Sequence, residues 1–381
     1  MSGRTAFGKG YAGGGPAFPA GVVERLGVDL TACWRRRVGM VTASVELTRE
    51  LIAQRGARQL TLFSSREPVA GLDATDCQHR LSPHRHELAN KLWLRGAEAA
   101  AGLDCMLYPY WPPALRHRQA PAAAFLVHDL AFRIRPEEVP WQQRAYLGSL
   151  LLPALRRAAL VLTPSEATRR DLLEHYPLLG LEKRVHAIGL GGRPAGANPG
   201  RLPSGLEPGF LLAVGTVEPR KNYHGLLAAY RLLKTRGVKV PLVIAGGPGW
   251  GYGDLPQRLA LEPGVHLLGH VDDAALQALY RNASVLAYPS LYEGFGLPLL
   301  EALEAGLPAL VSNSGSLPEV AGEAALTVDP LQPEAIAECL ERLLLDADLR
   351  RRLSIAGRAR AERFTWSGMA ERTWRLLDSL S

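Results

Sequence analysis

The order of apolar segments along the chain is the feature that most limits its fold. Short apolar stretches with the character of buried strands alternate with helical patterns, and they do so in two separate series. Such alternation is typical of parallel βαβ units. The expected elements of the first series are strands at residues 25–31, 59–63, 106–108 and 122–127 and a helix near 45–54, and those of the second are strands at 210–214, 242–245, 265–268, 285–288 and 309–311.

A segment rich in Gly and Pro, residues 189–209, separates the two series and suits neither a helix nor a strand. The 381 residues also exceed the length of one average domain. We therefore predict an α/β protein with two Rossmann-like, doubly wound domains and a ligand cleft between the carboxyl ends of their strands. The expected division is a flexible Gly-rich tail (1–25), an N-terminal domain (26–190), a linker (191–208), a C-terminal domain (209–365) and a last helix (366–381) that packs back on the N-terminal domain.

Composition narrows the class of protein. With 47% hydrophobic and 21% charged residues, the chain is an ordinary globular protein, and its apolar stretches are too short or too interrupted to span a membrane. Four scattered cysteines and the lack of a secretory signal favour the reducing cytoplasm. Cys77, His79, His84 and His86 cluster, but their spacing is not that of a zinc motif. We read their segment as a polar loop that enters a helix and expect no metal site.

The net charge of +7 is unevenly distributed. Residues 1–205 carry 27 Lys and Arg against 17 Asp and Glu, whereas residues 206–381 carry 17 against 20. A basic half favours anionic partners, namely nucleic acid, phosphorylated substrates or an anionic membrane face. The plain alternative is a solvated, Arg-rich surface.

Residues 288–301, YPSLYEGFGLPLLE, form the most informative motif. A buried strand ends in a glycine-containing loop, and Pro298 suits the first turn of a following helix. Backbone amides of Gly294, Phe295 and Gly296 can approach a ligand closely, and a helix N-terminus there favours an anion. Glu293 and Glu301 bracket the loop, where two carboxylates suit the hydroxyls of the two sugars of a nucleotide sugar. The alternatives are a solvated loop acid for Glu293 and dipole complementarity in the first helical turn for Glu301.

Residues 214–222, VGTVEPRKN, form a second motif in which a strand ends at a glycine turn, Gly215. Arg220 and Lys221 follow side by side. Adjacent cations near the carboxyl end of a strand can neutralise a diphosphate leaving group without a metal. A surface salt bridge is the alternative interpretation.

Along the chain, motif 214–222 precedes motif 288–301 by about 70 residues. In this chain order the two motifs resemble those of the retaining glycosyltransferases of family 4, which have the GT-B fold. The resemblance covers most of the chain from about residue 26 to 375. It implies that Glu301 holds the nucleotide ribose, and that Glu293 and the amides of 294–296 hold the transferred sugar. It also implies that Arg220 and Lys221 bind the diphosphate, and that the turn at Val271 in HLLGHVDD passes near the base.

The first half carries weaker resemblances. FLVHDLAF, residues 125–132, is similar to the family's HD element, so His128 would bind a sugar hydroxyl or supply a backbone carbonyl; a structural His is the alternative. TPSE, residues 163–166, matches another family segment, although its Ser also suits a helix N-cap. VGMVT, residues 38–42, stands where similar enzymes have a GIGRY-like turn. Gly39 remains for the diphosphate, but Val41 disfavours positive φ, so we expect a reshaped loop that changes either the choice of acceptor or the activity itself.

These observations predict a cytoplasmic, retaining glycosyltransferase that needs no cofactor besides its nucleotide diphosphate sugar. The combined motifs look most like bacterial mannosyl or rhamnosyl transferases of surface polysaccharide assembly, which makes GDP-mannose the first donor to expect. The acceptor would be a glycan or a lipid-linked hydroxyl, and the basic half would face it or an anionic membrane rather than nucleic acid. A sugar-nucleotide epimerase of similar fold and a catalytically silent nucleotide-sugar binder are the alternatives.

Overall fold

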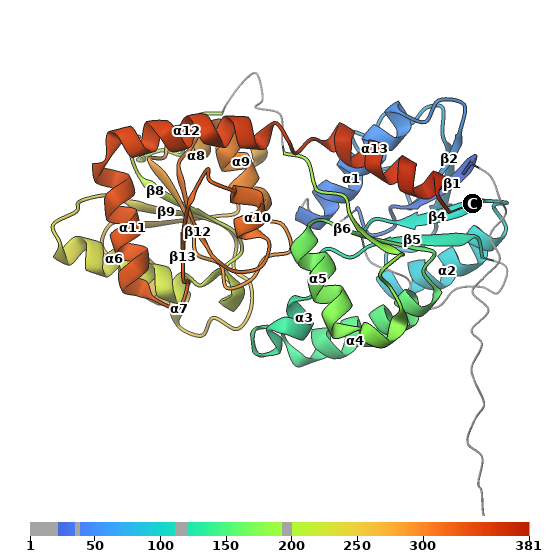
Figure 1. Cartoon of the computed structure of the whole chain (residues 1–381), viewed down its shortest axis with the longest axis horizontal. Coiled ribbons are helices and arrows are strands. Elements are labelled where there is room, and N and C mark those ends of the chain that lie inside the picture. The colour runs from blue at the N-terminus through green and yellow to red at the C-terminus, as the bar shows by residue number, and fades with distance from the viewer. Residues whose placement is uncertain (1–21, 35–38, 111–119, 193–199, 381) are drawn as a thin grey trace, which may run out of the picture.

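Two α/β domains lie side by side in the computed structural model, which describes residues 22–34, 39–110, 120–192 and 200–380 (Figure 1). Each domain has one sheet whose paired strands are all parallel. The strand orders are β3-β2-β1-β4-β5-β6-β7 and β10-β9-β8-β11-β12-β13. The predicted α/β fold class with two Rossmann-like domains is confirmed. The Gly-rich tail up to residue 21 and linker residues 193–199 lie outside the described part.

The N-terminal domain contains the elements β1 (Arg25–Asp29), α1 (Gly39–Ala53), β2 (Gln59–Ser65), β3 (Gln78–Ser82), α2 (Glu87–Ala99), β4 (Cys105–Tyr108), β5 (Ala122–Leu126), α3 (Ala131–Ile134), α4 (Trp141–Arg157), β6 (Leu160–Thr163), α5 (Glu166–His175) and β7 (Val185–Ala187). The C-terminal domain contains β8 (Leu211–Val214), α6 (Tyr223–Thr235), β9 (Leu242–Ala245), α7 (Leu255–Leu261), β10 (Val265–Gly269), α8 (Asp273–Asn282), β11 (Val285–Tyr288), α9 (Leu297–Ala305), β12 (Ala309–Ser312), α10 (Leu317–Ala321), β13 (Leu326–Val328), α11 (Pro333–Leu345) and α12 (Ala347–Ala361). The last helix, α13, spans Trp366–Asp378.

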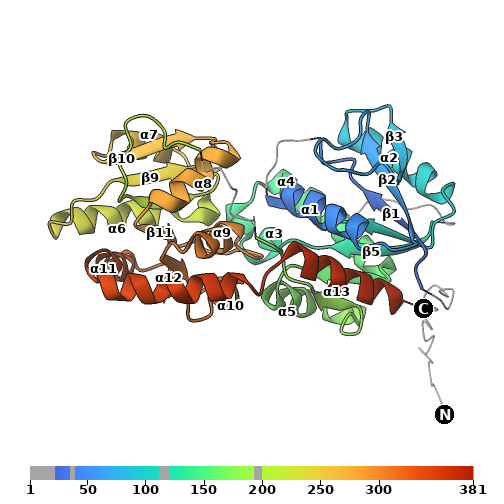
Figure 2. The same cartoon turned by 90° about the horizontal axis from the view of Figure 1, so that it is seen from above.

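The central strands are apolar on both faces because helices cover each sheet from both sides (Figure 2). In the C-terminal sheet, Leu211 and Ala213 of β8 pack with α6 and α11, whereas Leu212 and Val214 point to the core under α8 and α9. The carboxyl ends of the strands are the edges from which the loops to the next helices leave. The motif residues follow β8 and β11 and therefore lie at one such edge.

Two elements differ from the sequence expectations. The first helix begins at Gly39 rather than near residue 45, so Val41 is a buried helical residue and does not lie in a loop. The expectation of a loop at Val41 is wrong, because this stretch is the first turn of α1, whereas Val41 avoids positive φ as expected of a valine. Val38 lies outside the described residues. The segment of Cys77 and the three histidines is likewise no simple loop, because β3 forms the polar edge strand of the sheet there.

Helix α13 lies on the N-terminal domain beside α1, although the chain reaches it from the C-terminal domain (Figure 1). Arg58 fixes it through an ion pair with Asp378 at 2.8 Å and through its guanidinium, 4.7 Å from the ring centre of Trp374. Met369 and Leu377 bury their side chains in the same core as α1. Over the described ranges, none of the helices is both long and apolar enough to cross a bilayer.

Candidate active site

The loop between β11 and α9 presents a row of backbone donors. Gly296 adopts φ +96° and caps α9, which begins at Leu297 with Pro298 in its first turn, as the sequence predicts to within one residue. A Cβ at Gly296 would lie 2.5 Å from Leu317, so a glycine is needed both for the backbone angle and for space. The amides of Gly294, Phe295 and Gly296 donate to no group within the described ranges. Together with the helix dipole they form a site suited to an anion.

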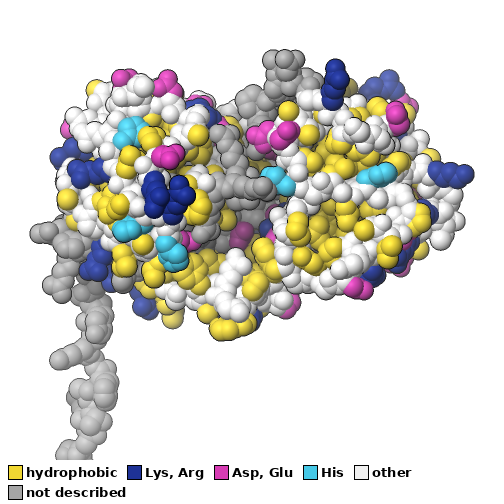
Figure 3. All heavy atoms as spheres, turned by 180° about the vertical axis from the view of Figure 1, so that it is seen from behind, with side chains coloured by type: hydrophobic (Ala, Val, Ile, Leu, Met, Phe, Trp, Pro, Cys, Tyr) yellow, Lys and Arg dark blue, Asp and Glu magenta, His cyan; other side chains and the backbone are white. Residues whose placement is uncertain are grey.

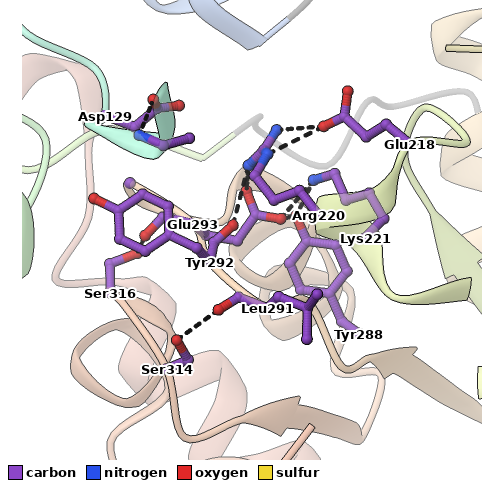
Figure 4. A network of polar contacts seen from close by, with 12 residues as sticks. Asp129, Glu218, Arg220, Lys221, Tyr288, Leu291, Tyr292, Glu293, Ser314 and Ser316 are labelled. Carbon is purple, nitrogen blue, oxygen red and sulfur yellow. Dashed lines mark hydrogen bonds and ion pairs between the residues drawn. The ribbon is translucent and has the colours of Figure 1, made fainter. Parts of the chain in front are cut away.

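An ion cluster of five residues, namely Glu218, Arg220, Lys221, Tyr288 and Glu293, adjoins this loop (Figure 4). Glu293 accepts from Lys221 Nζ at 2.6 Å and from Tyr288 Oη at 2.8 Å on Oε1, and from Arg220 at 2.6 Å on Oε2. Arg220 also makes a two-pronged contact with Glu218, at 2.7 and 3.1 Å. A short 3₁₀ turn, Pro219–Lys221, brings the two cations to the β11 loop from the end of β8.

Burial decides the electrostatics of this cluster. The side chains of Glu218 and Glu293 are 4% and 7% exposed. Burial alone would raise the pKa of Glu293, but Arg220 and Lys221 outweigh it and lower the pKa to about 2. Burial opposes the charge of Arg220 as well, yet Glu293 and Glu218 raise its pKa well above the ordinary value. At neutral pH the carboxylate of Glu293 is therefore ionised and cannot supply a proton.

The two cations retain some hydrogen-bonding capacity. A guanidinium has five N–H donors and an ammonium three. Arg220 uses four of them on Glu218, Glu293 and the carbonyl of Tyr292, and Lys221 uses two on Tyr288 and Glu293. Counted over the described residues, each cation has one N–H left for a further acceptor.

Glu301 occupies a separate place on α9. It lies in the second turn of the helix and accepts a hydrogen bond of 3.0 Å from Tyr280 Oη of α8. The dipole interpretation, which needed the first turn, is therefore wrong. A buried carboxylate held by a neighbouring tyrosine is oriented for a fixed partner such as a pair of sugar hydroxyls.

The remaining predicted residues lie around the same edge or across from it. Gly215 has φ +142°, and a Cβ there would lie 3.0 Å from Lys221 Cε, so the glycine makes room for the lysine. Val271 is half-buried in the turn between β10 and α8. Gly39 faces Leu297 across the domains, because its Cβ would lie 3.5 Å from that side chain.

His128 is buried at the end of β5, and its Nε2 lies 2.8 Å from the carbonyl of Pro109. Burial lowers the pKa of His128, so its imidazole is held neutral. Its own carbonyl oxygen meets the loop between β11 and α9: a Cβ on Gly294 would lie 2.0 Å from it. Of the two roles implied for His128, the backbone carbonyl is the one that reaches the loop in this structure.

The N-terminal domain has a cavity of about 400 Å³ beside the carboxyl ends of β1 and β2. Val41 and Val45 of α1 form one wall, and Arg66 and Arg85 contribute cationic groups. Ser64 is 1% exposed and lines the cavity with a hydroxyl that has no hydrogen-bond partner in the described part of the chain. The cavity therefore offers both apolar and polar contacts.

Comparisons with known proteins fit this geometry. Residues 197–360 match the family model described as glycosyl transferases group 1. The chain is also 36% identical over 257 residues to O-antigen chain mannosyltransferase B of Escherichia coli, covering 65% of this chain and 67% of that protein. The chain belongs to the group 1 glycosyltransferases.

Other similarities of this glycosyltransferase are more distant. It is 33% identical over 222 residues to the MMP alpha-(1->4)-mannosyltransferase of Mycolicibacterium hassiacum, covering 57% of this chain and 53% of that protein. Among solved structures, sucrose-phosphate synthase from Thermosynechococcus elongatus has a TM-score of 0.74 at 21% identity, covering 94% and 99% of the two chains. WaaG, a glycosyltransferase involved in lipopolysaccharide biosynthesis, has a TM-score of 0.68 at 17% identity, covering 92% and 99%. These likenesses show the GT-B fold.

Sequence reasoning missed two members of the ion cluster of this glycosyltransferase. Tyr288 and Glu218 both stand inside the quoted motifs, yet neither received a role. A buried Tyr at a strand end and an acid two residues before Arg220 are the signals that were available. The interdomain contacts of Ser165 were also missed, because only its capping role could be read from the sequence.

Proposed function

We propose that this glycosyltransferase is a retaining mannosyltransferase that moves mannose from GDP-mannose to a hydroxyl of a glycan or lipid-linked acceptor. One observation carries the proposal: the cluster of Arg220, Lys221 and Glu293 adjoins three loop amides at the start of α9 that have no partner in the described part of the chain. Mannosyltransferase relatives at 36% and 33% identity support the choice of sugar. The choice of GDP-mannose as the donor and the retaining stereochemistry are part of this proposal.

In this proposal the diphosphate of the donor takes the remaining N–H groups of Arg220 and Lys221, and the loop amides bind the transferred sugar. Glu301 holds the ribose. As the bond between the sugar and the phosphate breaks, negative charge grows on the diphosphate, and fixed donors in a buried site stabilise it. Since the chain itself supplies this stabilisation, we expect transfer to continue in the presence of EDTA.

Glu293 is a poor candidate for a nucleophile. Both of its oxygens are engaged, one by Lys221 and Tyr288 and the other by Arg220. Counted over the described residues, three of its four lone pairs are thus committed, and the fourth can accept from a sugar hydroxyl while the carboxylate orients the two cations. We therefore infer that the acceptor attacks on the face that the diphosphate leaves, with a phosphate oxygen taking its proton.

The acceptor would bind to the N-terminal domain. The cavity beside β1 and β2, with Ser64, Arg66 and Arg85, supports this choice. Near it, α2 and α4 expose Leu88, Leu92, Trp141 and Tyr146, and Figure 3 shows basic and hydrophobic side chains interspersed on this domain. We propose that this side meets the inner face of an anionic membrane. Cosedimentation with phosphatidylglycerol vesicles at low salt, lost at high salt, is the expected result; no binding at low salt would contradict it.

The donor is tested by measuring binding of GDP, UDP, ADP and dTDP sugars and then transfer to acceptor extracts. We expect GDP-mannose to bind and to be consumed only with acceptor, and the product to keep the α anomeric configuration by NMR. Conversion of the donor without acceptor would indicate an epimerase, and binding without transfer a silent binder. Glu293→Ala and Lys221→Ala should abolish turnover, whereas Glu371→Ala, which removes an exposed ion pair with Arg375, should not.

A further inference from the structure

Two carbonyl groups of the loop between β11 and α9, residues 289–296 and here called the donor loop, are held from two different domains. Glu293 O accepts from the backbone N–H of Ser316 at 3.1 Å and from its hydroxyl at 3.0 Å, both within the C-terminal domain. Gly294 O instead accepts from two hydroxyls of the N-terminal domain, Ser165 at 2.7 Å and Thr168 at 3.0 Å. All these groups are buried.

These carbonyl contacts fix the direction of the amides. In a planar trans peptide the C=O and the following N–H point to opposite sides, and the described chain has no cis peptide. Holding Glu293 O therefore sets the direction of the Gly294 N–H. Holding Gly294 O sets the direction of the Phe295 N–H, so one of the three loop donors is oriented by the opposite domain.

A second contact keeps the two hydroxyls in place. The carboxylate of Glu319, on α10 of the C-terminal domain, accepts from the backbone amides of Glu166 and Ala167, both at 2.9 Å. These amides form the first turn of α5, and Ser165 is the N-cap of that helix. A carboxylate at a helix N-terminus satisfies free N–H groups and complements the dipole. Glu319 thus ties the start of α5 to the domain that carries the donor loop.

We propose that Ser165, Thr168 and Glu319 form an interdomain clamp that positions the donor loop for transfer. The clamp residues are positioning residues, because they act on the sugar through the peptide between Gly294 and Phe295. The loop reaches this arrangement only when the domains approach each other as they do here. This inference rests on the proposed function, since it assigns the loop amides to the donor.

Gly294 makes the clamp possible. A Cβ there would lie 2.0 Å from His128 O and 2.8 Å from Asp129 Cβ. Only a glycine lets the loop backbone come close enough to the N-terminal domain for its carbonyl to meet Ser165 and Thr168. Gly294 is therefore needed for the contact between the domains as well as for the close approach of a ligand.

The test compares the double variant Ser165→Ala/Thr168→Val with wild type. We expect kcat for transfer to fall about 10-fold or more because one donor amide loses its orientation. Affinity for the free nucleotide diphosphate should stay within about 3-fold, because Arg220, Lys221 and Glu301 are untouched. Thr373→Val is the matched control: among the described residues its hydroxyl bonds only to Met369 O within α13, and its loss should leave kcat unchanged.

Hydrogen exchange without substrate separates the clamp from the proposed function. Peptides covering residues 290–298 should exchange faster in the double variant than in wild type, and Glu319→Gln should do the same for 165–169. The single variant Ser165→Thr, which keeps the hydroxyl, should exchange in residues 290–298 as slowly as wild type. Unchanged exchange and kcat in the double variant, or a parallel loss of kcat and nucleotide affinity, would overturn the clamp. If wild type transfers to no acceptor, the proposed function fails, and the exchange result still decides whether the clamp orders the loop.

Discussion

Removal of the buried charge of Glu293 is the perturbation whose cost the structure specifies best. In Glu293→Gln, Arg220 keeps its ion pair with Glu218, whereas Lys221 loses the carboxylate that it pairs with and is left beside the neutral Tyr288 and a neutral amide. The pKa of Glu293 falls from 4.5 to about 2 on folding. That difference corresponds to about 3 kcal/mol of the free energy of unfolding. Breaking a buried ion pair by removing one partner costs about 3–5 kcal/mol, so the two magnitudes agree.

Urea denaturation followed by fluorescence and circular dichroism measures this cost. The two domains can unfold in separate steps, so the midpoint is taken from the transition that the variant moves. Glu371→Gln is the control; its ion pair with Arg375 is 68% and 71% exposed, and its loss should cost about 0.5 kcal/mol or less.

A second substitution tests the physical cause. Lys221→Met added to Glu293→Gln removes the charge that the first change leaves buried and uncompensated. The double variant should therefore be more stable than Glu293→Gln alone by about 1 kcal/mol or more. A Glu293→Gln variant within about 1 kcal/mol of wild type, or a double variant no more stable than the single one, would refute the reasoning.

Three further predictions concern pH, the domain contact and the last helix. Because folding depresses the pKa of Glu293, its stabilisation is complete above pH 4.5 and is lost as the pH falls towards 2, so urea midpoints should fall more steeply there for wild type than for Glu293→Gln. Gly294→Ala should force the domains apart, which would raise the radius of gyration in small-angle scattering and reduce transfer about 10-fold or more. Gly96→Ala is the control and should do neither, because a Cβ there would meet no described atom within 4 Å. Trp374→Ala should destabilise the N-terminal domain by about 3–5 kcal/mol in urea, because the side chain is 5% exposed; an unchanged midpoint would show that α13 is not part of that core.

Much of the fold could be predicted because the central strands are buried on both faces. Stretches such as Leu242–Ala245 and Val285–Tyr288 are continuous apolar runs, and the strands begin and end where those runs do. The polar edge strand β3 gave no such signal, since Gln78 and His79 are exposed and Arg80 is only half-buried. The start of α1 was missed because Gly39 was read as part of a turn, and a lone glycine does not prevent a helix from beginning.

The site could be predicted only as far as local sequence reaches. The motifs brought Arg220, Lys221 and Glu293 to one sheet edge, because parallel strands place their carboxyl ends together. Their mutual ion pairs span more than 70 positions of the chain and depend on side-chain directions that spacing does not encode. The contacts of Ser165 with Gly294 cross the two domains, so no pattern within either domain indicates them.

The position of α13 has a consequence for synthesis of the chain on the ribosome. Trp366, Met369 and Leu377 cover the face of the N-terminal domain beside α1, yet they are made after the whole C-terminal sheet. The N-terminal domain therefore keeps an apolar face exposed until α13 has been made, by which time the elements of the C-terminal sheet have already been synthesised. The C-terminal domain can complete its core before the N-terminal domain does. A ribosome that stalls before residue 366 would therefore leave an incompletely folded N-terminal domain whose exposed apolar surface chaperones would bind.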